Sequence, residues 1–90
     1  MRGNNTIITD ILLELRAAKR KQPTWPDHIV ARAAMVAEEA GELLRASLQY
    51  KYEPLLFLDN EGMRAEMRKE AIQTAAMCLR FIEALDKDKL

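Results

Sequence analysis

The sequence predicts an all-α protein, a single domain of three main helices whose bundle is completed by oligomerisation. The chain has 90 residues, of which 49% are hydrophobic, and this suits one folded domain over residues 1–90. Three glycines and three prolines leave too few turns for an all-β fold. Apolar residues recur at helical spacing in three stretches, residues 6–21, 26–50 and 61–86.

The first stretch, residues 6–21, carries an apolar stripe along one helix face. Asn5 or Thr6 can cap its first turn. The basic residues 19–21 complement the negative end of the helix dipole. The stripe follows the i, i+3, i+4, i+7 pattern and consists of Ile8, Ile11, Leu12, Leu15 and Ala18.

The second stretch, residues 26–50, follows a break at Pro23. Thr24 is the expected N-cap, and Pro26 fits the first turn, where a missing N–H has no cost. Trp25 is expected to pack over the start of this helix, and the alternative is that it stacks on a nucleobase. The central apolar stripe consists of Ile29, Ala33, Val36, Ala40, Leu43 and Ser47.

The third stretch, residues 61–86, follows a connection over residues 51–60. Pro54 ends the second helix, residues 55–58 form a packed turn, and Asp59 or Asn60 provides the next cap. Ten of the fourteen residues from 71 to 84 are apolar and surround the helix almost completely. Two other helices cannot cover such a helix on all sides, so we expect a partner chain.

The informative anomaly is the position of the glutamates. Glu39 and Glu42 project beside the apolar arc of the second helix, and Glu70 lies among apolar residues of the third. Carboxylates are seldom placed there unless they are paired or bind a metal. The spacing i, i+3 lets two carboxylates on one helix face reach one Mg²⁺ ion. The alternative is surface salt bridges with Arg32, Arg45 and Arg68 as partners.

Composition excludes several other classes. The 14 basic residues balance the 14 acidic ones, which argues against direct nucleic-acid binding and against an electrostatic membrane anchor. The longest apolar runs have five residues, too few for a transmembrane span. One cysteine, Cys78, and one histidine, His28, exclude a disulfide framework and a Cys/His zinc site. The expected location is the cytoplasm.

The acidic motifs resemble those of a known family. The run EEAGEL, residues 38–43, is similar to the EExGEL signature of MazG-like, all-α nucleoside triphosphate pyrophosphohydrolases. The run EAIQ, residues 70–73, resembles the family's second element, ExxD, at the usual separation. The run EAIQTAAMCLRFIE, residues 70–83, and the Trp-Pro pair before the second helix look like the small phage- and mobile-element-type branch.

The resemblance implies a helical bundle that forms a dimer or tetramer. It implies Mg²⁺-dependent hydrolysis (with Mn²⁺ as a substitute) of a nucleoside triphosphate to the monophosphate and pyrophosphate. The role would be housecleaning of damaged nucleotides or control of a normal nucleotide pool, and the sequence does not distinguish the two. Glu39, Glu42 and Glu70 would be metal ligands, and Glu38 a supporting catalytic acid beside Glu39.

Position 73 departs from the motif, because Gln73 stands where the family has Asp. A Gln oxygen can still ligate Mg²⁺ but brings no charge, so we expect weaker metal binding. Glu66 lies one turn before Glu70 and could restore that charge.

Basic and aromatic residues should hold the rest of the substrate. Lys51 and Arg80 are candidates for the phosphates. Trp25, Tyr50 and Tyr52 are candidates for the base, and nothing in the sequence decides among them. Two other functions stay open: a non-catalytic relative that binds a nucleotide or protein, which Gln73 favours, and a plain interaction module with solvated acids.

Overall fold

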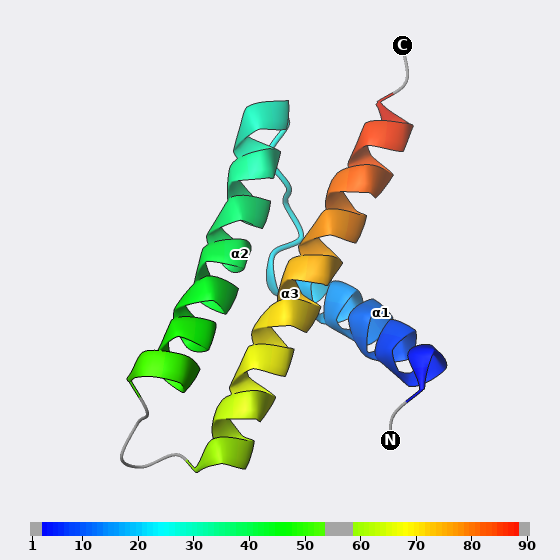
Figure 1. The fold of residues 1–90 in the computed structure, drawn as a ribbon. Helices are drawn as coiled ribbons and strands as arrows, with labels where there is room; N and C mark the ends of the chain where they lie inside the picture. Colours follow the sequence, from blue (N-terminus) through cyan, green and yellow to red (C-terminus); the bar gives the residue numbers. More distant parts are fainter. Residues whose placement is uncertain (1–2, 54–58, 89–90) are drawn as a thin grey trace.

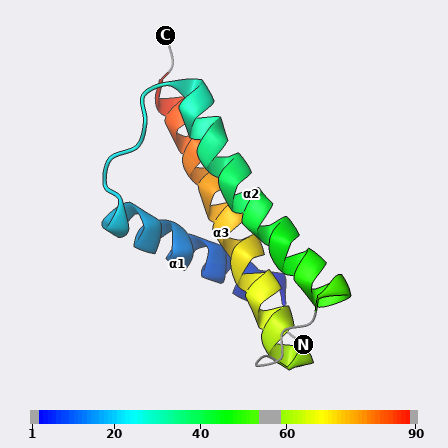
Figure 2. The same cartoon turned by 90° about the vertical axis from the view of Figure 1, so that its left-hand side faces the viewer.

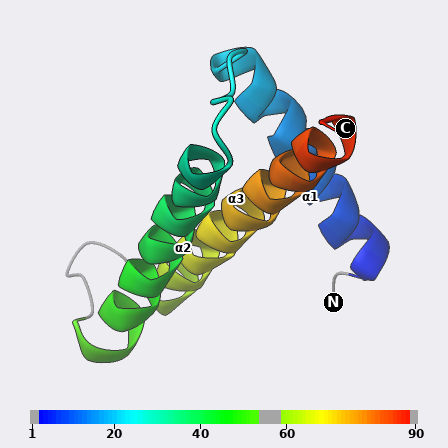
Figure 3. The same ribbon diagram turned by 90° about the horizontal axis from the view of Figure 1, so that it is seen from above.

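The computed structural model describes residues 3–53 and 59–88, and the predicted all-α class is confirmed over these residues. Three helices, α1 (Asn4–Lys21), α2 (Ile29–Tyr52) and α3 (Asn60–Lys87), pack together, and the described residues form no strand. Helices α2 and α3 lie side by side and antiparallel, and α1 crosses α3 obliquely (Figures 1 and 3). Both α1 and α2 therefore pack on α3, and within the described residues their own backbones do not approach each other (Figure 2).

Helix α1 begins two residues before the predicted start. Gly3 is the N-cap residue and makes no side-chain cap bond, so the predicted caps Asn5 and Thr6 are wrong and lie inside the helix. The backbone N–H groups of Thr6 and Ile7 donate to the Gly3 carbonyl at 3.1 and 3.3 Å. The helix ends at Lys21, as the basic run predicts.

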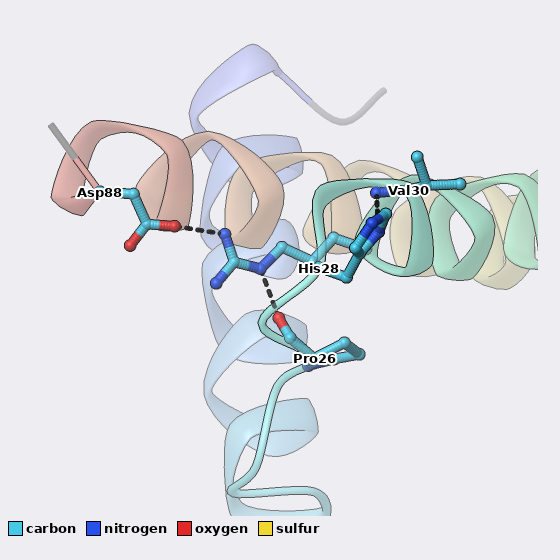
Figure 4. Close-up of polar contacts among 5 residues, drawn as sticks. Pro26, His28, Val30 and Asp88 are labelled. Atoms are coloured by element: carbon cyan, nitrogen blue, oxygen red, sulfur yellow. Dashed lines mark hydrogen bonds and ion pairs between the residues drawn. The ribbon is translucent and has the colours of Figure 1, made fainter. Parts of the chain in front are cut away.

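Helix α2 begins later than predicted, and the Thr24 cap is wrong. His28 is the N-cap, and its Nδ1 accepts a hydrogen bond from the Val30 N–H at 3.2 Å. In a helix from residue 26, that N–H would donate to the Pro26 carbonyl. The Arg32 side chain occupies this carbonyl instead and also pairs with Asp88 at 2.6 Å, so Pro26 stays outside the helix (Figure 4).

Helix α3 is capped as predicted, because Asp59 Oδ1 accepts from the Gly62 N–H at 2.7 Å. The predicted helix end at Pro54 and the packed turn at residues 55–58 lie outside the described residues. Within the described ranges, every helix is too short or too polar to form a transmembrane span.

The core is thin and lies where α1 and α2 cover α3. Leu15, Ala76 and Met77 form its buried cluster, and Trp25 packs against this cluster. Ala76 is fully buried, whereas Ile82 is 52% exposed. One side of α3 is therefore covered within the chain and another is left open. Along the described helices, the exposed large apolar residues include Leu12, Leu13, Val30, Leu44, Leu48 and Leu85.

Candidate metal centre

Three carboxylates from two helices meet at one point of the α2–α3 interface. Glu39 and Glu42 lie one turn apart on α2, and antiparallel packing places Glu70 of α3 against them. One carboxylate oxygen of each residue lies within 4.8 Å of the other two. The structure therefore brings together the three residues that the sequence predicts as metal ligands, and whether an ion binds there stays a prediction.

Two of these carboxylates each have one buried oxygen atom without a hydrogen-bond partner. Glu70 is 8% exposed, and its Oε2 has no partner in the described structure. The Oε2 atom of Glu39 is likewise buried and unpaired. Buried polar atoms in native proteins are almost always hydrogen-bonded, so this pair of atoms needs an explanation. Oxygen donors from three carboxylates are the ligand set that Mg²⁺ and Mn²⁺ prefer.

The electrostatic environment favours the protonated form of both groups. Burial raises the pKa of Glu70 most, and its hydrogen bond and charge interaction with Glu42 raise it further, while Lys69 acts in the opposite direction. Burial also raises the pKa of Glu39, followed by the charges of Glu42, Glu38 and Glu14. A cation between the carboxylates would oppose both effects.

The arginines proposed as salt-bridge partners are engaged elsewhere. Arg32 pairs with Asp88, and Arg68 pairs with Asp10 at 2.7 Å. Arg45 lies near Glu42 along one cavity wall but forms no ion pair with it. Within residues 3–53 and 59–88, no salt bridge includes Glu39, Glu42 or Glu70. The alternative of simple surface ion pairs is therefore wrong for this part of the chain.

The carboxylates lie between two cavities, and Glu42 lines both. The first cavity, of about 280 Å³, includes the predicted ligand Glu66, whose exposed carboxylate is 3.6 Å from Lys69 Nζ. The second, of about 380 Å³, includes Glu38 and Gln73. The first is lined by Glu42, Arg45, Ala46, Gln49, Met63, Glu66 and Glu70. The second is lined by Glu14, Ala18, Lys21, Gln22, Met35, Glu38, Glu39, Glu42, Gln73 and Met77.

The predicted substrate-binding residues line neither of these cavities. Arg80 is 5% exposed, donates to the Gln22 carbonyl at 2.8 Å and lies 4.5 Å from the Trp25 ring centroid. Arg80 and Trp25 line a different hollow, near the C-terminal end of α3. Lys51 is exposed in the last turn of α2. Arg80 and Trp25 thus hold the α1–α2 connection in place rather than facing the carboxylates.

Sequence reasoning missed two residues of the second cavity, Glu14 and Lys21. Both belong to α1, where Glu14, Ala18 and Lys21 share one face at the spacing i, i+4, i+7. That stripe can be seen in the sequence. Which face of α1 turns toward the glutamates of α2 depends on how α1 crosses α3, and the sequence does not contain a local signal for it.

Replacing Glu70 by Gln is expected to stabilise the metal-free chain by about 1–3 kcal/mol at pH 7, the usual cost of an unsatisfied buried polar group. The Gln amide can donate to Glu42 and carries no charge. In the folded chain, the pKa of Glu70 lies above its ordinary value of 4.5. Protonated Glu70 therefore stabilises the wild-type chain below pH 4.5, and this stability is lost as the pH rises through the raised pKa. The gain in the variant should therefore vanish below pH 4.5.

Urea unfolding in EDTA at several pH values measures this effect. Glu66→Gln is the matched control, because Glu66 lies one turn earlier on α3 and is exposed. Its unfolding free energy should change by less than about 0.5 kcal/mol. A Glu70→Gln variant that is less stable than the wild type at pH 7 in EDTA would contradict the reading of Glu70 as an uncompensated carboxylate.

Comparison with known proteins identifies no relative of this chain: no protein-family model, no curated protein and no solved structure matches it.

Proposed function

We propose that the protein is a Mg²⁺-dependent nucleoside triphosphate pyrophosphohydrolase of the MazG-like type, with Mn²⁺ as an acceptable substitute. The observation that supports it is the meeting of Glu39, Glu42 and Glu70 with two buried, unpaired carboxylate oxygens. These are residues of the EExGEL and ExxD-like elements. Carboxylates alone would repel a triphosphate, so a function on phosphates requires a cation at this point.

The reaction proposed is attack of water on the α-phosphorus. A new P–O bond forms there, and the bond to the oxygen that bridges to the β-phosphorus breaks, so pyrophosphate leaves with that oxygen. Bound Mg²⁺ would supply charge neutralisation of the phosphoryl oxygens and a lowered pKa of the attacking water. Glu39, Glu42 and Glu70 would hold the ion, and Glu38, which lines the second cavity, would accept the proton of the water.

Gln73 supports a second candidate function, a nucleotide-binding relative that has lost catalysis. Its side chain lines the cavity that contains Glu38 and Glu39. The negative charge that the Asp of the ExxD motif would bring is therefore absent from the site itself. The retention of three clustered carboxylates favours the enzyme, because an uncompensated cluster destabilises the fold.

Pyrophosphate release from a panel of normal and modified nucleoside and deoxynucleoside triphosphates distinguishes the two functions. The enzyme releases pyrophosphate with Mg²⁺ and not with EDTA. Mg²⁺-dependent nucleotide binding without release, measured by calorimetry, would establish the second candidate. Absence of both release and binding would contradict both and leave an interaction module.

We also propose that the active form is a homo-oligomer, a dimer or tetramer, in which a second copy covers the open side of α3. The core of a 90-residue chain is small, and the described part buries few apolar side chains. An apolar hollow of about 330 Å³ lies on this side between α2 and α3. It is lined by Ala33, Val36, Cys78, Phe81 and Ile82.

Ile82→Glu is expected to shift the oligomer to a monomer, because it places a charge in this apolar hollow. Sedimentation velocity or light scattering at micromolar concentration measures the change. Ala65→Glu, an exposed position on the same helix, should leave the assembly intact. A wild-type chain that is monomeric at these concentrations would contradict the proposal.

A further inference from the structure

The second cavity is lined by a basic side chain that forms no ion pair within the described structure. Among the residues that line this cavity, Lys21 is the one with a positive charge, and no ion pair within residues 3–53 and 59–88 includes it. Its neighbour Lys19 behaves differently, because it pairs with Glu83 of α3 at 2.7 Å and lines another hollow. The two lysines are thus two residues apart in the chain but line different cavities.

The end of α1 that carries Lys21 is held in place by its neighbours. The N–H of Gln22 donates to the Ala18 carbonyl at 2.8 Å, and the carbonyl of Gln22 accepts from the buried Arg80 guanidinium. Arg80 in turn lies over Trp25, which packs on the core. Lys21 is therefore attached to a fixed backbone at the cavity wall, although its side chain is exposed.

The cavity is lined by charges of both signs, and α1 contributes one of each. Glu14 and Lys21 lie on the same face of α1, seven residues apart, which is about 10 Å along the helix axis. Glu14 is one of four acidic residues that line this cavity, together with Glu38, Glu39 and Glu42. Lys21 lines the same cavity and lies about two helical turns along α1 from Glu14.

We propose that Lys21 binds the terminal phosphates of the substrate, the part that leaves as pyrophosphate. This inference rests on the proposed function, which places the α-phosphorus at the carboxylates. The β- and γ-phosphates then extend away from Glu39 and carry most of the charge of the triphosphate. A lysine ammonium is a compact positive charge that binds the negatively charged phosphates, whereas an uncharged nucleobase offers it no opposite charge. Lys21 thereby takes the part that the sequence assigned to Lys51 and Arg80.

Calorimetric titration of inorganic pyrophosphate and of a nucleoside monophosphate, both with Mg²⁺, tests this directly. Lys21→Gln is expected to weaken pyrophosphate binding about tenfold, the effect of losing one charged hydrogen bond. Monophosphate affinity should not change, because that product lacks the terminal phosphates. In turnover, KM for the triphosphate should rise more than kcat falls. Lys21→Arg should retain most of the affinity.

Lys19→Gln is the matched control and should leave both affinities unchanged, because Lys19 lies outside the cavity. Equal pyrophosphate binding by wild type and Lys21→Gln would overturn the inference, and so would an equal loss for pyrophosphate and monophosphate. Failure of the proposed function has a different signature: wild-type protein would release no pyrophosphate from any triphosphate.

Discussion

Glu42→Gln is expected to lower the rate of Mg²⁺-dependent pyrophosphate release by about 10²–10³-fold, the usual effect of removing one charge-stabilising group from an active site. Glu42 lines both cavities and lies within 4.8 Å of Glu39 and Glu70, so it is the shared member of the cluster. Gln keeps the shape of the side chain and removes its charge. The measurement is initial-rate release of pyrophosphate with the triphosphate that the wild type prefers.

The control for this prediction is Glu61→Gln, an exposed glutamate in the first turn of α3. It makes the same chemical change on a helix of the same site and should leave release unchanged. The unfolding free energy of Glu42→Gln in EDTA should not fall, because the substitution removes a repulsive charge beside Glu39 and Glu70. If Glu42→Gln released pyrophosphate at the wild-type rate, the carboxylate cluster would have no part in the reaction.

The second large effect expected is stabilisation of the wild type by Mg²⁺ at pH 7. Binding to the folded state alone contributes about 1.4 kcal/mol when the free ion is at ten times its dissociation constant. For a domain of this size, that raises Tm by several degrees. The effect should shrink as pH falls toward 4.5, because protons compete for Glu39 and Glu70, whose pKa values are raised in the folded chain. Thermal unfolding monitored by circular dichroism measures it.

Two variants make this thermal measurement specific. Glu70→Gln should lose most of the Mg²⁺-induced rise in Tm, and Gln73→Asp should enlarge it by adding a carboxylate to the cavity of Glu39. Choline chloride at matched ionic strength controls for general salt effects. A rise in Tm that is the same in the wild type and in Glu70→Gln would show that Mg²⁺ acts elsewhere on the chain.

Helices and their polar ends could be predicted where a local signal is present. The three stretches of helical periodicity became α1, α2 and α3, and Asp59 caps α3 as predicted. The start of α2 could not be predicted, because the Thr24-Trp25-Pro26 sequence is a good local helix start. Arg32 and Asp88, which is 56 residues further along the chain, keep Pro26 outside the helix. A long-range contact therefore overrides a favourable local pattern.

The sequence by itself determined that Glu39 and Glu42 share one helix face, because they are three residues apart. The antiparallel packing of α2 and α3 brings Glu70, the third predicted ligand, to them. Only the tertiary structure decided which other residues share the cavity. The crossing of α1 over α3 turns Glu14 and Lys21 toward this centre and places Arg80 with Trp25 at the core. Periodicity specifies the faces of a helix, whereas the packing of all three helices selects the face that meets the site.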